Sequence, residues 1–119
     1  MLSTVEVTGH GDTGTPAGTL DLLILTTLHL GPLHGWAISR RIQYQSDDVL
    51  RVGQGSLYPA LYRLEERGLV RASWGVSDEG RRAKFYQLTA AGKRALLRES
   101  TAWRAYSGAV NLVLEGSGL

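Results

Sequence analysis

The chain has 119 residues, of which 43% are hydrophobic and 20% are charged. This length and composition indicate one small globular domain and exclude a wholly disordered chain. No apolar run approaches the roughly 20 residues that a bilayer crossing needs, and the absence of cysteine excludes disulfides, thiolate metal sites and cysteine nucleophiles. Residues 1–8 lack a basic start and an apolar stretch, so we expect no signal peptide, no membrane partner and a cytoplasmic location.

Positive charge is concentrated in the middle of the chain. The formal net charge is only +2, but residues 33–98 carry 12 Lys and Arg against 6 Asp and Glu, and the segments on either side are net acidic. A localised basic region favours a polyanionic partner such as nucleic acid, although many basic faces are only solvated surface.

The first helix is expected over about residues 20–30, after a Gly- and Thr-rich segment. Residues 1–18 hold few large apolar side chains, so we expect them to form a flexible tail. Thr19 is placed to cap the helix, and a Gly-Pro pair ends it. The helix is apolar nearly all round, which predicts burial on more than one side. We therefore assign Leu22 and Leu25 to a contact with a second chain.

A second helix is expected over residues 35–45, with an apolar stripe formed by Trp36, Ile38 and Ile42. Arg40 and Arg41 lie outside this stripe. The sequence leaves two interpretations for them, a solvated surface or a contact with nucleic acid. A short extended piece follows at Leu50 to Val52.

The third predicted helix, about Ser56 to Arg67, has two different faces. At 100° per residue, its core face is Leu57, Leu61 and Leu64. The opposite half carries Tyr58, Pro59, Tyr62, Arg63 and Glu66. Two tyrosines beside a proline and an arginine are unusual for a merely solvated face. We place Pro59 in the first turn, where its missing N–H would have had no intrahelical partner.

Two strand-like runs follow the third helix. They are rich in β-branched and aromatic residues and cover Leu69 to Trp74 and Lys84 to Leu88. The loop between them is polar and its return side is basic, so the pattern predicts a hairpin. Which of Phe85 and Tyr86 faces inward stays open from alternation alone.

Thr89 is placed to cap a last helix that reaches about Glu115 and would be roughly 40 Å long. Its large apolar residues follow a heptad spacing at Leu96, Trp103, Tyr106, Val110 and Val113. A seven-residue period is typical of a seam against another helix, and a domain of this size is too small to cover so long a helix. We therefore expect residues 89–115 to form a dimerisation helix, followed by a short tail over 116–119.

Three helices and then a hairpin is the order of a winged helix-turn-helix. The sequence thus predicts a mainly α fold with a small two-stranded β wing over residues 19–88, plus the long C-terminal helix. In that fold the third helix enters the DNA major groove and the wing lies along the backbone. The candidate DNA contacts are Gln54, Ser56, Tyr58, Pro59, Tyr62, Arg63, Arg81, Arg82 and Lys84, with Arg40 added from the second helix.

The same residues carry a family resemblance. The run Gly55–Val70 resembles the recognition-helix signature of the PadR-like transcriptional regulators, and Leu33–Ile38 and Gly80–Thr89 support the match. The resemblance covers about Thr19–Glu115, and Trp36 stands where the family more often has Tyr. It implies a short member that dimerises through its first and last helices. The family consists mostly of repressors, some of which respond to small planar aromatic compounds.

We therefore expect a homodimeric repressor that binds a pseudo-palindromic double-stranded DNA operator and is released by a small aromatic effector. Trp103 has two interpretations: dimer core, or the ligand-stacking residue that the resemblance implies. The alternatives are a winged-helix protein-interaction module without DNA binding and a small-molecule carrier. His29 and His34 have no carboxylate nearby in sequence, and no nucleophile–base pair or phosphate loop is visible, so we expect no enzyme, no metal and no cofactor.

Overall fold

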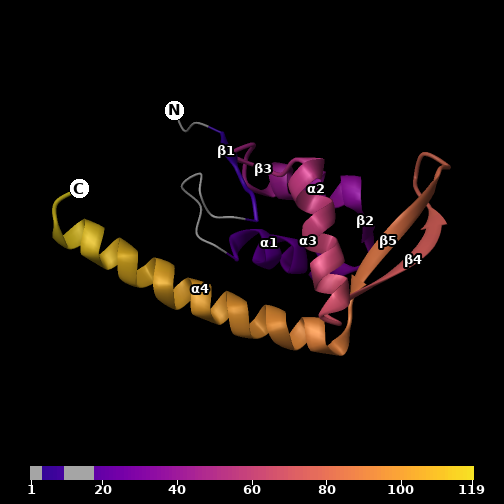
Figure 1. Ribbon diagram of the computed structural model, residues 1–119. Coiled ribbons are helices and arrows are strands. Elements are labelled where there is room, and N and C mark those ends of the chain that lie inside the picture. Colours follow the sequence, from indigo (N-terminus) through magenta and orange to yellow (C-terminus); the bar gives the residue numbers. More distant parts are fainter. Residues whose placement is uncertain (1–3, 10–17) are drawn as a thin grey trace.

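The computed structural model describes residues 4–9 and 18–119. Its elements, in chain order, are β1 (Val5–Glu6), α1 (Thr19–Thr27), a 3-10 turn (Leu28–Leu30), β2 (Leu33–His34), α2 (Gly35–Gln45), β3 (Leu50–Arg51), α3 (Gln54–Glu66), β4 (Val70–Val76), β5 (Arg82–Leu88) and α4 (Ala90–Gly116). The three shorter helices lie together, the β4–β5 hairpin projects from one side of them, and α4 runs past them and beyond (Figure 1). No helix in the described ranges is long and apolar enough to span a membrane.

The core forms where the apolar faces of α1, α2 and α3 meet. Leu57, Leu61 and Leu64 are fully buried, which confirms the predicted core face of α3. Leu25 is also fully buried among these residues, so its assignment to a contact between chains is wrong. An all-apolar helix does not reveal from sequence which side faces its own domain, and here Leu25 faces inward while Leu22 stays half-buried.

Trp36 does not belong to the apolar stripe of α2, because its side chain is 48% exposed. Ile38 and Ile42 do form that stripe and are buried. Trp36 lies in the first turn of α2, and its ring stacks on His34 instead.

The hairpin is part of a three-stranded antiparallel sheet in the order β2-β5-β4 rather than a two-stranded unit. Leu33 pairs with Tyr86, and His34 pairs with Phe85. Strand β2 was not predicted because two residues are too few to show the alternation of polar and apolar side chains that indicates a strand. The sheet also places Tyr86 inward, where it is buried, while Phe85 packs its ring edge against His34.

Part of the segment predicted to be a flexible tail is a strand. The backbone N–H of Val7 donates to the carbonyl of Arg51 at 2.8 Å, β1 runs parallel to β3, and Val7 is fully buried. The flexible-tail prediction is therefore wrong for residues 4–9, because an average over a Gly- and Thr-rich segment hides one buried valine. Residues 1–3 and 10–17 of the predicted tail lie outside the described residues.

Two helix starts differ from expectation. Gly18, with φ 87°, precedes α1, so Thr19 lies inside the helix rather than capping it. Helix α3 begins at Gln54, which puts Pro59 in its second turn instead of its first. Pro59 has no backbone N–H to donate to the carbonyl of Gly55, four positions earlier, so α3 lacks one hydrogen bond at this point.

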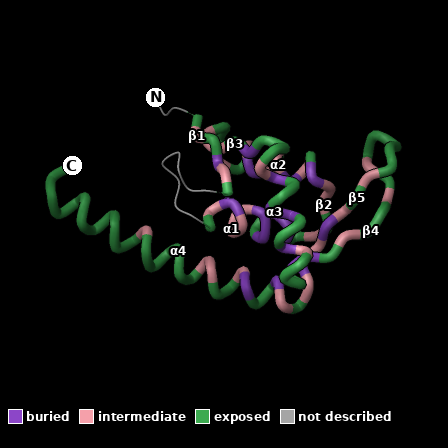
Figure 2. The backbone as a smooth tube through the Cα atoms, viewed as in Figure 1, coloured by how far each residue is buried: buried purple, intermediate pink, exposed green. Residues whose placement is uncertain are grey.

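The predicted cap of the last helix is present. The hydroxyl oxygen of Thr89 accepts a hydrogen bond from the N–H of Gly92 at 3.0 Å, and the O–H of Thr89 donates one to the carbonyl oxygen of Gly68 at 2.6 Å. This one side chain therefore starts α4 and ties it to the turn that ends α3. From residue 101 onward α4 is exposed except at Ser107 (Figure 2).

Candidate nucleic-acid interface

A groove of about 930 Å³ lies between the start of α2, α3 and the hairpin. Aromatic side chains line it from all sides, namely His34, Trp36, Tyr58, Trp74 and Tyr86. The hairpin adds the cations of Arg81, Arg82 and Lys84, against one lining carboxylate, Glu79. The groove therefore combines planar rings with net positive charge.

Because side chains alternate along a strand, one face of the β4–β5 hairpin points into the groove. Trp74 lies opposite Lys84 in the β4–β5 register, and Val76 lies opposite Arg82. Since side chains two residues apart share a face, Trp74, Arg82, Lys84 and Tyr86 all project the same way. Predicted wing residues Arg82 and Lys84 are thus brought together with an exposed tryptophan.

Two arginine–tryptophan pairs flank the groove. The Arg82 guanidinium carbon lies 4.5 Å from the Trp74 ring centroid, and that of Arg40 lies 4.7 Å from the Trp36 ring centroid. Lys84 is held differently, with its ammonium nitrogen 4.0 Å from a carboxylate oxygen of Glu65 and 5.8 Å from the Tyr86 ring centroid.

The ring of Tyr58 packs closely against Gly35 of α2, which has no side chain. The ring lies so close to Gly35 that a Cβ there would be 2.5 Å from the Tyr58 hydroxyl oxygen. The ring therefore forms part of the groove wall. Tyr62, one turn later on α3, is 63% exposed and is not among the groove residues.

Gln54 and Arg40 meet in a neighbouring hollow of about 320 Å³ that also includes Trp36 and Arg51. This hollow lies beside the start of α3. Ser56, in the first turn of α3, is half-buried, and Pro59 is exposed.

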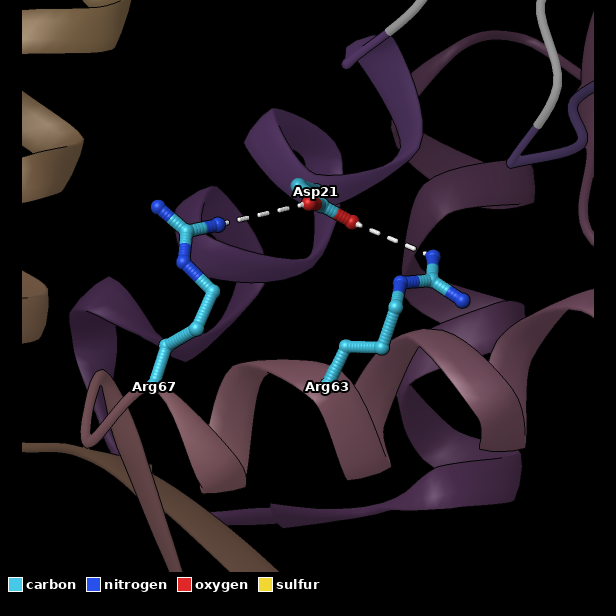
Figure 3. A network of polar contacts seen from close by, with 3 residues as sticks. All are labelled: Asp21, Arg63 and Arg67. Atoms are coloured by element: carbon cyan, nitrogen blue, oxygen red, sulfur yellow. Dashed lines mark ion pairs between the residues drawn. The ribbon is translucent and has the colours of Figure 1, made fainter.

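Arg63 does not join the groove. Its guanidinium faces Asp21 of α1, with the nearest nitrogen 3.9 Å from one carboxylate oxygen, and Arg67 approaches the other oxygen at 3.8 Å (Figure 3). Half of the Arg63 side chain remains exposed, on the flank of α3 nearest α1. The helical projection places Arg63 well inside the exposed half and could not show that its guanidinium faces a carboxylate on α1.

Burial raises the pKa of the Tyr86 phenol above its ordinary value of 10.0, and the negative charge of Glu65 and the neighbouring Tyr58 raise it further. Tyr86, which lines the groove beneath the ammonium group of Lys84, is therefore an uncharged phenol at physiological pH. Among the described residues, no group of three His, Asp or Glu side chains could hold a metal ion.

The predicted seam of α4 is separate from the groove. Leu96 packs against the core, whereas Trp103, Tyr106, Val110 and Val113 are exposed. The Trp103 and Tyr106 rings lie 6.2 Å apart, in a hollow of about 320 Å³ that they share with Leu22 of α1.

Sequence reasoning missed Trp36 and Trp74 as groove residues. Trp74 was visible as an aromatic residue in a strand, but such residues are usually assigned to packing. The sequence signal that could have indicated its exposure was the position of Trp74 near the hairpin loop, away from the helical core.

A helix-turn-helix formed by α2 and α3, followed by a β hairpin across a basic groove, defines a winged-helix protein. A family model described as the transcriptional regulator PadR-like family matches residues 24–98. The chain belongs to the PadR-like family of transcriptional regulators.

The chain is also similar to an uncharacterised protein and to solved structures of PadR proteins. The chain is 44% identical over 89 residues to an uncharacterised 37.1 kDa protein in transposon TN4556 of Streptomyces fradiae, which covers 75% of this chain but only 24% of that protein. A PadR family transcription regulator from Clostridium difficile has a TM-score of 0.71 at 29% identity, covering 82% of this chain and 99% of the other. Bacillus subtilis PadR, solved in complex with operator DNA, has a TM-score of 0.61 at 25% identity, covering 70% and 46%.

Proposed function

We propose that this chain is a sequence-specific DNA-binding regulator that acts as a homodimeric repressor. The observation that carries the proposal is the groove between α2, α3 and the wing, where aromatic rings and three cations gather on one face. Phosphate oxygens take cations and N–H donors, and an exposed helix face reads base edges in the major groove. The similarity to Bacillus subtilis PadR, which was solved with operator DNA, supports this assignment.

The proposed contacts divide by position. Tyr58, Pro59 and Tyr62 on α3 face the bases, and Gln54 and Ser56 at its start meet a phosphate or a base edge. The cations proposed to meet the backbone are Arg40, Arg81, Arg82 and Lys84. Arg63 would have to leave Asp21 to reach DNA, so we propose it as a flanking contact.

We propose that α4 forms the dimer. Its exposed seam of Trp103, Tyr106, Val110 and Val113 matches the heptad spacing of a helix that packs on another helix. A two-fold dimer places two copies of α3 about 34 Å apart, one turn of B-DNA, which fits a pseudo-palindromic operator. A small aromatic effector would occupy the hollow beside Trp103 and release the protein from DNA.

The test is selection of duplexes from a randomised library, followed by affinity measurement with Tyr62→Ala. We expect the wild type to select a two-fold sequence and Tyr62→Ala to bind it about 1–3 kcal/mol more weakly. Tyr44→Ala serves as a matched control, because Tyr44 is an exposed tyrosine at the far end of α2. Failure to select any sequence, with a protein partner captured instead, would favour a protein-interaction module.

A further inference from the structure

The wing carries an exposed tryptophan whose position the packing of the core does not explain. Trp74 is 60% exposed, and Val76 beyond it on the same face of β4 is exposed too. Aromatic side chains stabilise a fold mainly through the area they bury. Trp74 therefore contributes little to the core, and its ring lies on the exposed face of the wing.

The ring of Trp74 lies against Arg82. Because Trp74 pairs with Lys84 and Val76 pairs with Arg82, the arginine is the diagonal neighbour of the tryptophan on one face of the hairpin. The 4.5 Å separation between the guanidinium carbon and the ring centroid is within the range of a cation–π contact. An arginine side chain is long and flexible, so this contact restricts where the guanidinium points.

Arg82 differs from Lys84, its neighbour on the same face of the hairpin, in having no carboxylate partner among the described residues. Lys84 faces Glu65, and Arg63 faces Asp21. In the part of the chain that the structure describes, Arg82 forms no ion pair with Asp or Glu. The uncharged Trp74 ring therefore contacts the Arg82 guanidinium without neutralising its charge. The N–H donors of Arg82 stay available to an anion.

The pair lies on the groove, opposite Trp36 and Tyr58. We propose that Trp74 is a positioning residue for DNA binding: its ring orients the Arg82 guanidinium toward a phosphate of a duplex seated on the wing. This inference rests on the proposed function. A wing that acts only through its positive charge would not need Trp74. In this inference the uncharged Trp74 contributes to DNA binding by orienting the guanidinium of Arg82.

Charge and orientation can be separated by substitution. Trp74→Ala keeps the charge, so we expect the slope of log affinity against log salt to stay unchanged while operator affinity falls about two- to fivefold. Arg82→Ala removes the charge and should lower both the affinity and the salt slope, the latter by about one unit. The double variant should bind no more weakly than Arg82→Ala alone, because Trp74 acts through Arg82.

The experiment measures fluorescence anisotropy of a labelled duplex selected by the wild-type protein from a randomised library, over a series of KCl concentrations. It uses the wild type, both single variants, the double variant, Trp74→Phe as a conservative replacement, and Tyr44→Ala as an exposed-aromatic control. A readout without DNA is the NMR resonance of the Arg82 Nε–Hε group. The aromatic ring current shifts this resonance in the wild type, Trp74→Phe retains part of the shift, and Trp74→Ala abolishes it.

Each outcome decides the inference. An unchanged affinity in Trp74→Ala, additive losses in the double variant, or a lowered salt slope in Trp74→Ala would each overturn it while the wild type still binds DNA. A wild type that selects no duplex would instead overturn the proposed function, and this role with it. A loss in Trp74→Ala that disappears in the Arg82→Ala background, with the ring-current shift lost in parallel, supports the inference.

Discussion

Asp21 of α1 forms ion pairs with two arginines at the end of α3. Its carboxylate stands between Arg63 and Arg67, which extend from successive turns at the end of α3 (Figure 3). These two ion pairs link α1 to the end of α3, and the exposure of both arginines keeps their contribution to stability small. The same arrangement partly neutralises two positive charges at the end of α3.

We expect Asp21→Asn to lower the free energy of unfolding by less than about 1 kcal/mol, since both arginines are about half exposed and such pairs are weak. The variant should bind non-specific DNA more tightly at low salt, because it frees two cations beside α3. Chemical denaturation and anisotropy measure the two effects. Glu115→Gln, which changes the same charge at the far end of α4, is the control, and equal effects in both variants would refute a local role.

Tyr86 predicts how stability depends on alkaline pH. Burial and the negative charge of Glu65 raise its pKa in the folded state, so the folded protein resists forming the phenolate. The stabilising contribution is fully present below the unfolded-state pKa of about 10 and is lost as the pH rises through the folded-state pKa.

The free energy of unfolding should therefore fall more steeply above about pH 10 in the wild type than in Tyr86→Phe, which has no phenol to ionise. Urea titrations at a series of pH values measure this difference. Tyr44→Phe, at an exposed position, should keep the wild-type slope. Parallel curves for the wild type and Tyr86→Phe would show that folding does not raise the pKa of this phenol.

At the scale of elements, the long helix α4 approaches the rest of the domain through a glycine. A Cβ on Gly92 would overlap the carbonyl oxygen of Leu69, in the segment between α3 and β4. Backbone cannot move aside as a flexible side chain can, so only glycine allows the start of α4 to lie this close. Gly108, in the exposed part of the same helix, has no neighbour within 4 Å of an added Cβ.

Gly92→Ala should destabilise the protein by about 1–3 kcal/mol because the overlap forces α4 away from Leu69. Gly108→Ala should instead stabilise it by about 0.5–1 kcal/mol, since alanine is the better helix former. Thermal and urea denaturation of the two variants give opposite signs. Stabilisation by both substitutions would mean that α4 does not pack closely on this turn.

At the scale of the whole molecule, α4 extends well beyond the helical core, and from residue 101 onward it is exposed except at Ser107 (Figure 2). Its apolar seam faces solvent in a single chain. Burial of Trp103, Tyr106, Val110 and Val113 against a second copy would remove this exposed surface and set the spacing of the two α3 helices.

Trp103→Ala should weaken the dimer by about 2 kcal/mol, or roughly 30-fold in the dissociation constant, if Trp103 lies in the dimer core. Sedimentation velocity over a concentration series measures this constant. Leu112→Ala, on the opposite side of α4 by helical spacing, is the control and should have little effect. An unchanged dimer with loss of fluorescence quenching by planar aromatic compounds would assign Trp103 to an effector site instead. A monomeric wild type at micromolar concentration would refute both interpretations.

The sequence by itself determined the elements with strong local patterns. Leu57, Leu61 and Leu64 define the buried face of α3 because a helix repeats every 3.6 residues whatever surrounds it. Thr89 marks the start of α4 because a hydroxyl at that position satisfies an N–H that the helix leaves unpaired. The order of helices and hairpin, and the run of residues along α3, were sufficient to indicate the family.

Only the tertiary structure decided how side chains with several possible partners are used. Leu25 turns into its own core and Arg63 turns to Asp21, because residues distant in the chain compete for these side chains. The two-residue strands β1 and β2 exist only through partners across the fold. The groove itself unites Trp36, Tyr58 and Trp74 from three elements, and no local period in the sequence encodes the angle at which the wing meets α2 and α3.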